Sequence, residues 1–217
     1  MEPRLQKVWE EFLNPDVIRP RLIAASIYIA CFEALKDAIV GRIRDLFLNG
    51  FDQTGDIIDP KYDSKVLSRN KSPVYASLEW LKESAAINDV DIRAFNRVKD
   101  CRNNIAHRLF TLLGSEGLPP DFENCFSDMV SLLHKIEVWW IKNFEIPINP
   151  EYDGRDVDEK EIVPGRIMSL QLLIDIALGD EAKSRLYYEE FRKRAPRDWQ
   201  NPPVPDSHAG GAPGGAG

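Results

Sequence analysis

The chain has 217 residues, of which 43% are hydrophobic and 29% charged, and its formal net charge is −7. This length and composition suit one globular domain with appended segments, and the acidic balance argues against a general binder of polyanions. The longest uncharged apolar run, 22–32, is far shorter than the roughly 20 residues that a membrane span requires. Three scattered cysteines indicate a reduced compartment, and the charged N-terminal segment does not resemble a secretory signal. We therefore expect a cytoplasmic protein without a membrane partner.

Helical periodicity begins close to the N-terminus. Residues 4–13 carry apolar side chains at helical spacing, and Asn14-Pro15 ends this first segment. A long second helix is predicted from Pro20 to about Leu48, because proline suits a first helical turn and Asn49-Gly50 suits a helix end. The first half of this helix, 22–30, is apolar nearly all round. Such a segment is buried on more than one side, either at the centre of the fold or against another subunit.

The middle of the chain predicts one irregular connection and three further helices. Residues 51–72 show little periodicity, and a loop of that length is often mobile or functional. Helices are then predicted over 73–87, 89–114 and 121–144. The last of them repeats apolar residues at alternating steps of four and three, which is typical of packing in a bundle. No stretch alternates with period two well enough to predict a strand.

The remaining sequence predicts an acidic loop, two shorter helices and a disordered tail rich in Pro, Gly and Ala. The predicted fold class is therefore all-α, an up-and-down bundle of four main helices with shorter helices at both ends. The predicted parts are a short N-terminal helix (1–14), the bundle (15–145), the acidic loop with two accessory helices (146–195) and the tail (196–217).

One stretch of the predicted helix 89–114 combines residues suited to chemistry. It reads Lys99-Asp100-Cys101-Arg102-Asn103-Asn104-Ile105-Ala106-His107. Arg102 falls on the apolar side of the helix, where a lone charge is costly unless it is paired. Asn103 and His107 are four residues apart and are therefore neighbours on the opposite, polar side. Between 93 and 108, five basic residues stand against the single acid Asp100, which indicates a local basic face.

Arg102 and His107 cannot both point straight at one spot from a single helix. At about 100° per residue they lie about 140° apart around the axis. Either the arginine bends round the helix, or two copies of the helix face each other across a two-fold axis. The chain has no glycine-rich phosphate loop and no pair of His or Cys residues at metal-ligand spacing, so neither a cofactor nor a metal is expected.

The segment from Arg102 to His107 resembles the signature of the HEPN superfamily (higher eukaryotes and prokaryotes nucleotide-binding domains). That signature is an arginine, often followed by a polar residue, and a histidine after four to six residues. The resemblance covers about residues 15–145 and implies a helical bundle, commonly a homodimer, with metal-independent ribonuclease activity. One subgroup, silenced by nucleotide transfer, has a tyrosine two residues after the histidine. This chain has Leu109 there, so control by that modification is not expected.

The resemblance implies roles for particular residues. His107 would be the general base and Arg102 the ligand of the scissile phosphate, with Asn103, Asp100 and Lys99 in substrate-positioning or supporting roles. RNA would be the substrate, and the setting would be a toxin–antitoxin or anti-phage defence system, with an antitoxin or defence-system protein as a further partner.

A non-catalytic interpretation stands beside this one. The same bundle would then serve to dimerise or to dock a partner, and Arg102 would pair with a carboxylate of another helix, for example Glu33 or Glu79. The behaviour of a His107→Ala variant on labelled RNA in chelator separates the two interpretations.

Overall fold

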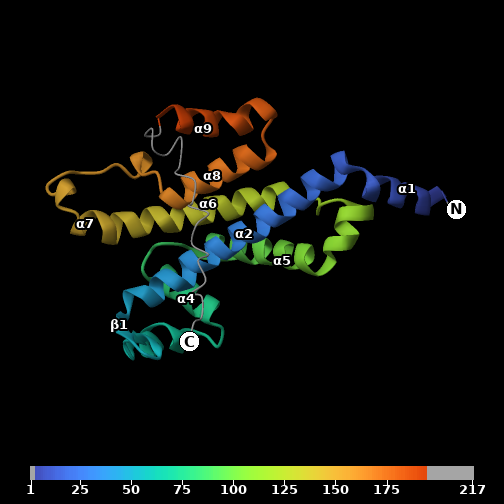
Figure 1. Ribbon diagram of the computed structural model, residues 1–217. Helices are drawn as coiled ribbons and strands as arrows, with labels where there is room; N and C mark the ends of the chain where they lie inside the picture. The colour runs from blue at the N-terminus through green and yellow to red at the C-terminus, as the bar shows by residue number, and fades with distance from the viewer. Residues whose placement is uncertain (1–2, 195–217) are drawn as a thin grey trace, which may run out of the picture. The chain divides into compact units, whose positions relative to one another are not determined.

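The computed structural model describes residues 3–194, which are mostly helical, as the sequence predicts (Figure 1). The chain divides into two compact units, Met1–Ile174 and Asp175–Gly217. None of the helices in the described part of the chain is long and apolar enough to cross a membrane. The helices are α1 (Pro3–Leu13), α2 (Pro15–Leu46), α3 (Lys61–Lys65), α4 (Pro73–Glu83), α5 (Asp89–Thr111), α6 (Phe122–Trp140), α7 (Ile146–Ile148), α8 (Gly165–Leu178) and α9 (Glu181–Arg194).

Helix α2 begins five residues earlier than the sequence predicts. The side chain of Asn14 accepts a hydrogen bond from the backbone N–H of Asp16 at 3.0 Å, and Pro15 occupies the first turn. Pro20 lies inside the helix. Asn14 is thus the cap of α2 as well as the stop of α1, and a proline near a helix start removes only one backbone hydrogen bond.

The prediction that residues 51–72 form an irregular connection is wrong. Strands β1 (Leu48–Asp52) and β2 (Gly55–Ile58) form an antiparallel hairpin there, and α3 and a 3₁₀ turn (Leu67–Arg69) follow. The turn is held by Asp52, whose Oδ1 accepts from the backbone N–H of Thr54 at 2.7 Å. An irregularity in the register between Leu48 and Gly50 breaks the period-two pattern, which is why periodicity did not indicate a strand.

Helix α2 is the centre of the bundle, since it packs against α1, α4, α5 and α6. Four residues of its second half, Leu35, Ala38, Ile39 and Ile43, are completely buried. In its first half Tyr28 is also buried, and its hydroxyl donates to the carbonyl of Val98 in α5 at 3.1 Å. The predicted burial on more than one side concerned residues 22–30 and is confirmed only in part. Ala25, Ile27 and Tyr28 are buried there, whereas Leu22, Ser26 and Ala30 are exposed.

A buried carboxylate joins α6 to α2. The side chain of Glu137 is only 2% exposed, and its Oε2 lies 3.0 Å from Nη2 of Arg42. Its other oxygen lies 3.5 Å from Nε of Arg166. Burial raises the pKa of Glu137, and the two arginines oppose that rise by stabilising the charged form.

The second unit contains the end of α8 and the whole of α9, and these two helices are the accessory helices that the sequence predicts within 146–195. The carboxylate of Asp175 accepts a hydrogen bond from the hydroxyl of Tyr187 and pairs with the ammonium of Lys183, both at 2.8 Å. The predicted tail from 196 onward lies outside the described residues.

We expect Leu35→Ala to lower the free energy of unfolding by about 2–5 kcal/mol, because it leaves a cavity in a fully buried seam. Leu46→Ala is the matched control on the same helix, where the side chain is 44% exposed, and should cost only about 0.5 kcal/mol. Urea unfolding followed by circular dichroism measures both. Equal losses would show that the core does not lie along this seam.

Candidate functional site

Helix α5 places the candidate residues, and its start is fixed by a reciprocal cap. The side chain of Asn88 accepts from the backbone N–H groups of Val90 and Asp91, and Oδ2 of Asp91 accepts from the backbone N–H of Asn88 at 2.8 Å. The helix is then regular through His107 and departs from helical geometry at Arg108, with φ −121° and ψ 18°. Of the residues that mark the expected apolar side, Phe95, Val98, Ile105 and Leu112 are buried and Leu109 is half-buried.

Arg102 lies beside the apolar seam and reaches the surface between α5 and α2. Its Nη2 lies 2.9 Å from Oε1 of Glu33, and its Nη1 donates to Oδ1 of Asn103 at 3.3 Å. The guanidinium carbon lies 5.2 Å from the ring centroid of Phe32, a cation–π contact. The Nε is buried and has no hydrogen-bond acceptor within the described residues. The side chain is 30% exposed, so Arg102 is anchored but accessible.

Arg102, Asn103 and Lys99 line one small pocket between α2, α4 and α5, with a volume of about 220 Å³. The ammonium of Lys99 donates to the hydroxyl of Tyr75 in α4 at 2.7 Å. This hydrogen bond raises the pKa of Lys99, so the ammonium stays charged at neutral pH. Three of the five candidate residues are therefore brought together around one cationic pocket.

His107 and Asp100 lie outside this pocket. The side chain of His107 is exposed, and it makes no hydrogen bond or ion pair with any residue in the described part of the chain. Within one copy of the chain, α5 thus carries Arg102 and His107 on different sides. Asp100 is also exposed, and it borders a second pocket on the side of α5 that faces α6.

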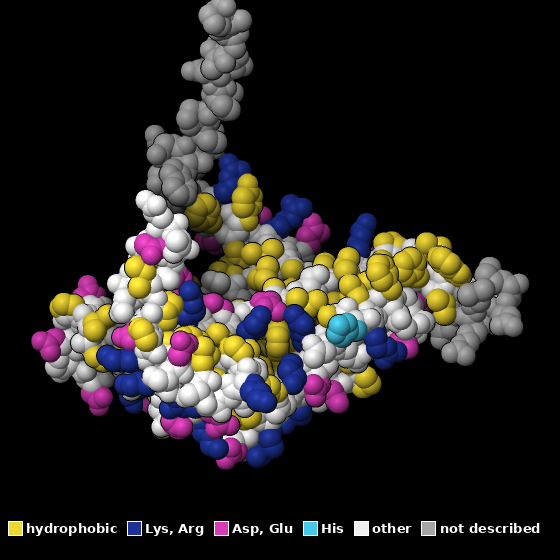
Figure 2. All heavy atoms as spheres, turned by 90° about the horizontal axis from the view of Figure 1, so that it is seen from below, with side chains coloured by type: hydrophobic (Ala, Val, Ile, Leu, Met, Phe, Trp, Pro, Cys, Tyr) yellow, Lys and Arg dark blue, Asp and Glu magenta, His cyan; other side chains and the backbone are white. Residues whose placement is uncertain are grey.

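The basic face that the sequence indicates is largely neutralised. Arg97 pairs with Asp128, Arg102 with Glu33 and Arg108 with Glu116, at 2.6 to 2.9 Å. Over the face drawn in Figure 2, acidic and basic side chains are interleaved. Pairing with acids from other segments is not visible in a local count of charges.

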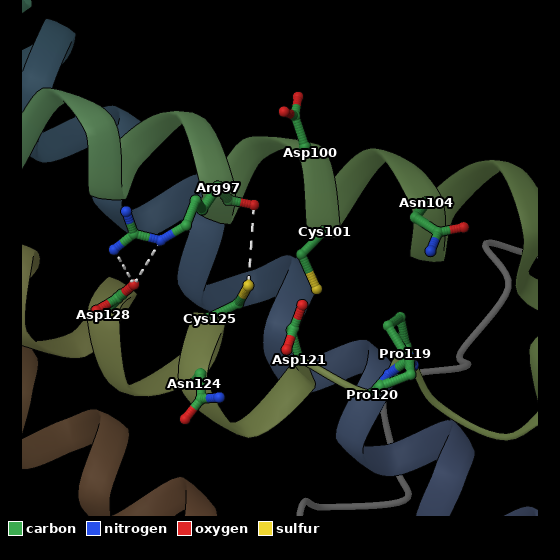
Figure 3. A pocket seen from close by; sticks show the side chains of 10 residues that line it. All are labelled: Arg97, Asp100, Cys101, Asn104, Pro119, Pro120, Asp121, Asn124, Cys125 and Asp128. Carbon is green, nitrogen blue, oxygen red and sulfur yellow. Dashed lines mark hydrogen bonds and ion pairs between the residues drawn. The ribbon is translucent and has the colours of Figure 1, made fainter.

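The second pocket lies between α5 and α6 and has a volume of about 560 Å³ (Figure 3). The thiols of Cys101 and Cys125 point into the space between the two helices. Burial, together with the neighbouring Cys101, raises the pKa of Cys125 to about 11. A thiol with such a pKa stays protonated at neutral pH, so Cys125 is not an activated nucleophile.

Comparisons of the chain with protein-family models, curated proteins and solved structures gave no match. Among residues 3–194, no group of three or more His, Cys, Asp or Glu side chains is placed to hold a metal ion.

The structure adds residues that sequence reasoning did not place at the site. Lys36, Tyr75 and Ser72 line the same pocket as Arg102. Tyr75 and Ser72 lie in and before α4, and helical periodicity within α5 carries no information about them. The sequence did contain one indication of Lys36. It stands three residues after Glu33, and this spacing places the two side chains on one face of α2, where they form an ion pair at 3.3 Å.

We expect Arg102→Met to lower the free energy of unfolding by less than about 1.5 kcal/mol, the sum of a partly exposed ion pair and a cation–π contact. Arg42→Met is the matched control, because its side chain is 25% exposed but it pairs with the buried Glu137. That variant should lose about 3 kcal/mol, since it weakens the pairing of a buried charge. Urea unfolding measures both. An equal or larger loss for Arg102→Met would make the arginine a structural residue.

Proposed function

We propose that the chain is a metal-independent RNA endonuclease of the HEPN type, acting in a toxin–antitoxin or anti-phage defence setting. The observation that carries the proposal is the state of the two motif residues. Arg102 is held at the edge of a cationic pocket with its guanidinium partly exposed, and His107, on the same helix, is exposed. Neither side chain is buried in the core, so a substrate can reach both.

The chemistry needs a base and a phosphate ligand. His107 takes the proton of a ribose 2′-hydroxyl, because imidazole is the usual general base at neutral pH. The 2′-oxygen attacks the adjacent phosphorus, the bond to the 5′-oxygen breaks, and the products are a 2′,3′-cyclic phosphate and a 5′-hydroxyl. Arg102 binds the scissile phosphate and stabilises the charge that develops in the transition state. Asn103 orients the histidine or holds the phosphate, and Lys99 and Asp100 support the site.

The proposal includes a symmetric homodimer built from HEPN-like, up-and-down bundles. Two facing copies of α5 would place two arginines and two histidines around one cleft, which removes the difficulty of the 140° separation within one helix. The apolar first half of α2 supports this arrangement, because Leu22 is 44% exposed although its neighbours in 22–30 are mostly apolar. In this proposal the exposed side chain of Leu22 is part of the surface that the partner copy covers.

A second candidate is a non-catalytic dimerisation or docking module with the same fold. The ion pair between Arg102 and Glu33 favours it, because a structural arginine would make this contact. The pair is partly exposed, however, and such pairs contribute only about 0.2–1 kcal/mol. A structural role alone therefore gives little reason for an arginine at this position.

We expect purified protein to cut single-stranded RNA in the presence of a chelator and to leave a 2′,3′-cyclic phosphate. His107→Ala should reduce the rate by about 10²–10⁴-fold, as expected for a general base, without changing the melting temperature. His134→Ala removes an exposed histidine of α6 and should leave the rate unchanged.

An RNA with 2′-deoxyribose before the cleavage site should bind but resist cleavage. Mass spectrometry of the products identifies the ends. Cleavage that leaves a 3′-hydroxyl would rule out this mechanism, and full activity of His107→Ala would rule out this site.

We expect light scattering at micromolar concentration to give twice the mass of one chain. Leu22→Asp should shift the protein toward the monomer and reduce cleavage, because it places a charge in the proposed interface. Leu46→Asp is the matched control, since this leucine lies on the same helix and is also 44% exposed. A monomeric wild-type protein that cuts RNA would contradict the dimer.

A further inference from the structure

The pocket beside Arg102 contains more positive charge than its own acid neutralises. Lys36 of α2 and Lys99 and Arg102 of α5 line it, and Glu33 is the only acidic residue among its lining residues. Its volume of about 220 Å³ is below the range of about 300–1,000 Å³ that is usual for drug-sized ligands. Charge and size together favour a small anionic group over a whole nucleotide.

Glu33 engages two of the three cations at once. Its Oε1 lies 2.9 Å from Nη2 of Arg102, and its Oε2 lies 3.3 Å from Nζ of Lys36. Burial alone would raise the pKa of Glu33, but the hydrogen bonds from Lys36 and Arg102 outweigh it and hold that pKa below its usual value. A carboxylate that bridges an arginine and a lysine makes the contacts that a phosphate group makes with the same residues.

The third cation is held by neutral partners. Lys99 donates to the hydroxyl of Tyr75, which donates in turn to Oδ1 of Asn96 at 2.6 Å. Within the described residues, no carboxylate lies in ion-pair distance of Lys99. The ammonium is thus fixed at the pocket without an ion pair of its own in the described residues, although the charge of Asp100 lies close enough to favour it, and Tyr75 and Ser72 line the same space.

Rigid surroundings hold these groups in place. The guanidinium of Arg102 stacks on Phe32, and Phe95 packs against both Phe32 and Tyr75 with ring centroids 6.0 and 6.1 Å apart. Glu33, in contrast, is 45% exposed and can swing away from the pocket without disturbing the core. Arg102 and Lys99 are therefore preorganised, whereas the exposed side chains of Glu33 and Lys36 are the movable members of the cluster.

We infer that this pocket binds a backbone phosphate of the RNA substrate, and that Glu33 occupies the phosphate position until RNA displaces it. The inference rests on the proposed function and adds to it a binding subsite and an internal competitor. In this account Glu33 weakens the binding of RNA, whereas a carboxylate that merely positioned Arg102 would strengthen it. The two roles predict changes of opposite sign on removal of the charge.

The test uses Glu33→Gln in the full chain, with a fluorescein-labelled single-stranded RNA of mixed sequence whose 2′-hydroxyls are all methylated. This probe cannot be cut by attack of the 2′-oxygen, so fluorescence anisotropy reports binding alone. We expect Glu33→Gln to bind about three- to tenfold more tightly than wild type, because two competing ion pairs are lost. Glu159→Gln, which releases Lys142 from an exposed ion pair elsewhere, is the matched control and should not change the affinity.

Lys99→Gln tests the cation that has no ion pair in the described residues. We expect it to weaken binding and to reduce the slope of log affinity against log salt by about 0.7, the change for one lost phosphate contact on a single strand. Melting curves by circular dichroism check that each variant is folded. A titration with inorganic phosphate separates a free anion from the RNA backbone. If Glu33→Gln raised the affinity for inorganic phosphate but not the affinity for RNA, the assignment of the pocket to RNA would be overturned.

Unchanged or weaker RNA binding by Glu33→Gln, or an unchanged salt slope for Lys99→Gln, would overturn the inference. These outcomes are independent of cleavage. If the variants behave as expected but wild type cuts no RNA, the nuclease proposal fails and the phosphate pocket stands. If wild type cuts RNA but Glu33→Gln binds it no better, the nuclease proposal stands and the competitor role fails.

Discussion

The buried seam of α2 determines where the other main helices of the bundle lie. Leu35, Ile39 and Ile43 are completely buried in this helix, which packs against α4, α5 and α6, and each such side chain contributes about 1.5–3 kcal/mol by leaving water. The same packing brings Phe32 and Glu33, one turn before Leu35, against α5. The contacts of the candidate site are therefore a direct consequence of the core, and α2 contributes to both.

Two charged groups of this bundle, the carboxylate of Glu137 and the guanidinium of Arg102, differ in their exposure to solvent. Glu137 is enclosed, and two arginines compensate in part for the loss of water around it. Arg102 also lies beside an apolar seam, but its guanidinium packs over the ring of Phe32 and remains partly exposed next to the carboxylate of Glu33. The first arrangement serves only the fold. The second leaves a cation partly exposed at the surface, with contacts that stabilise the fold only modestly.

The sequence predicted those features that depend on residues close together in the chain. The cap at Asn88 and the apolar spacing of α5 placed its start and its buried side correctly, because both are properties of one continuous helix. The hairpin at 48–58 was not predicted because its strands are short and irregular in register. The start of α2 was placed too late because Pro15 and Pro20 lie close together and both suit a first helical turn. The contribution of Tyr75 to the pocket depends on the packing of α4 against α5, which no periodicity within either helix encodes.

We propose that the cleavage site is shared between two copies of the chain, with the arginine of one copy and the histidine of the other meeting across a two-fold axis. The most direct measurement mixes inactive Arg102→Ala and His107→Ala proteins in equal amounts and follows RNA cleavage after subunit exchange. About half of the dimers are then mixed, and each contains one intact arginine–histidine pair across the axis, so about a quarter of the wild-type activity should return. No recovery, with exchange confirmed by differently tagged copies, would contradict a shared site.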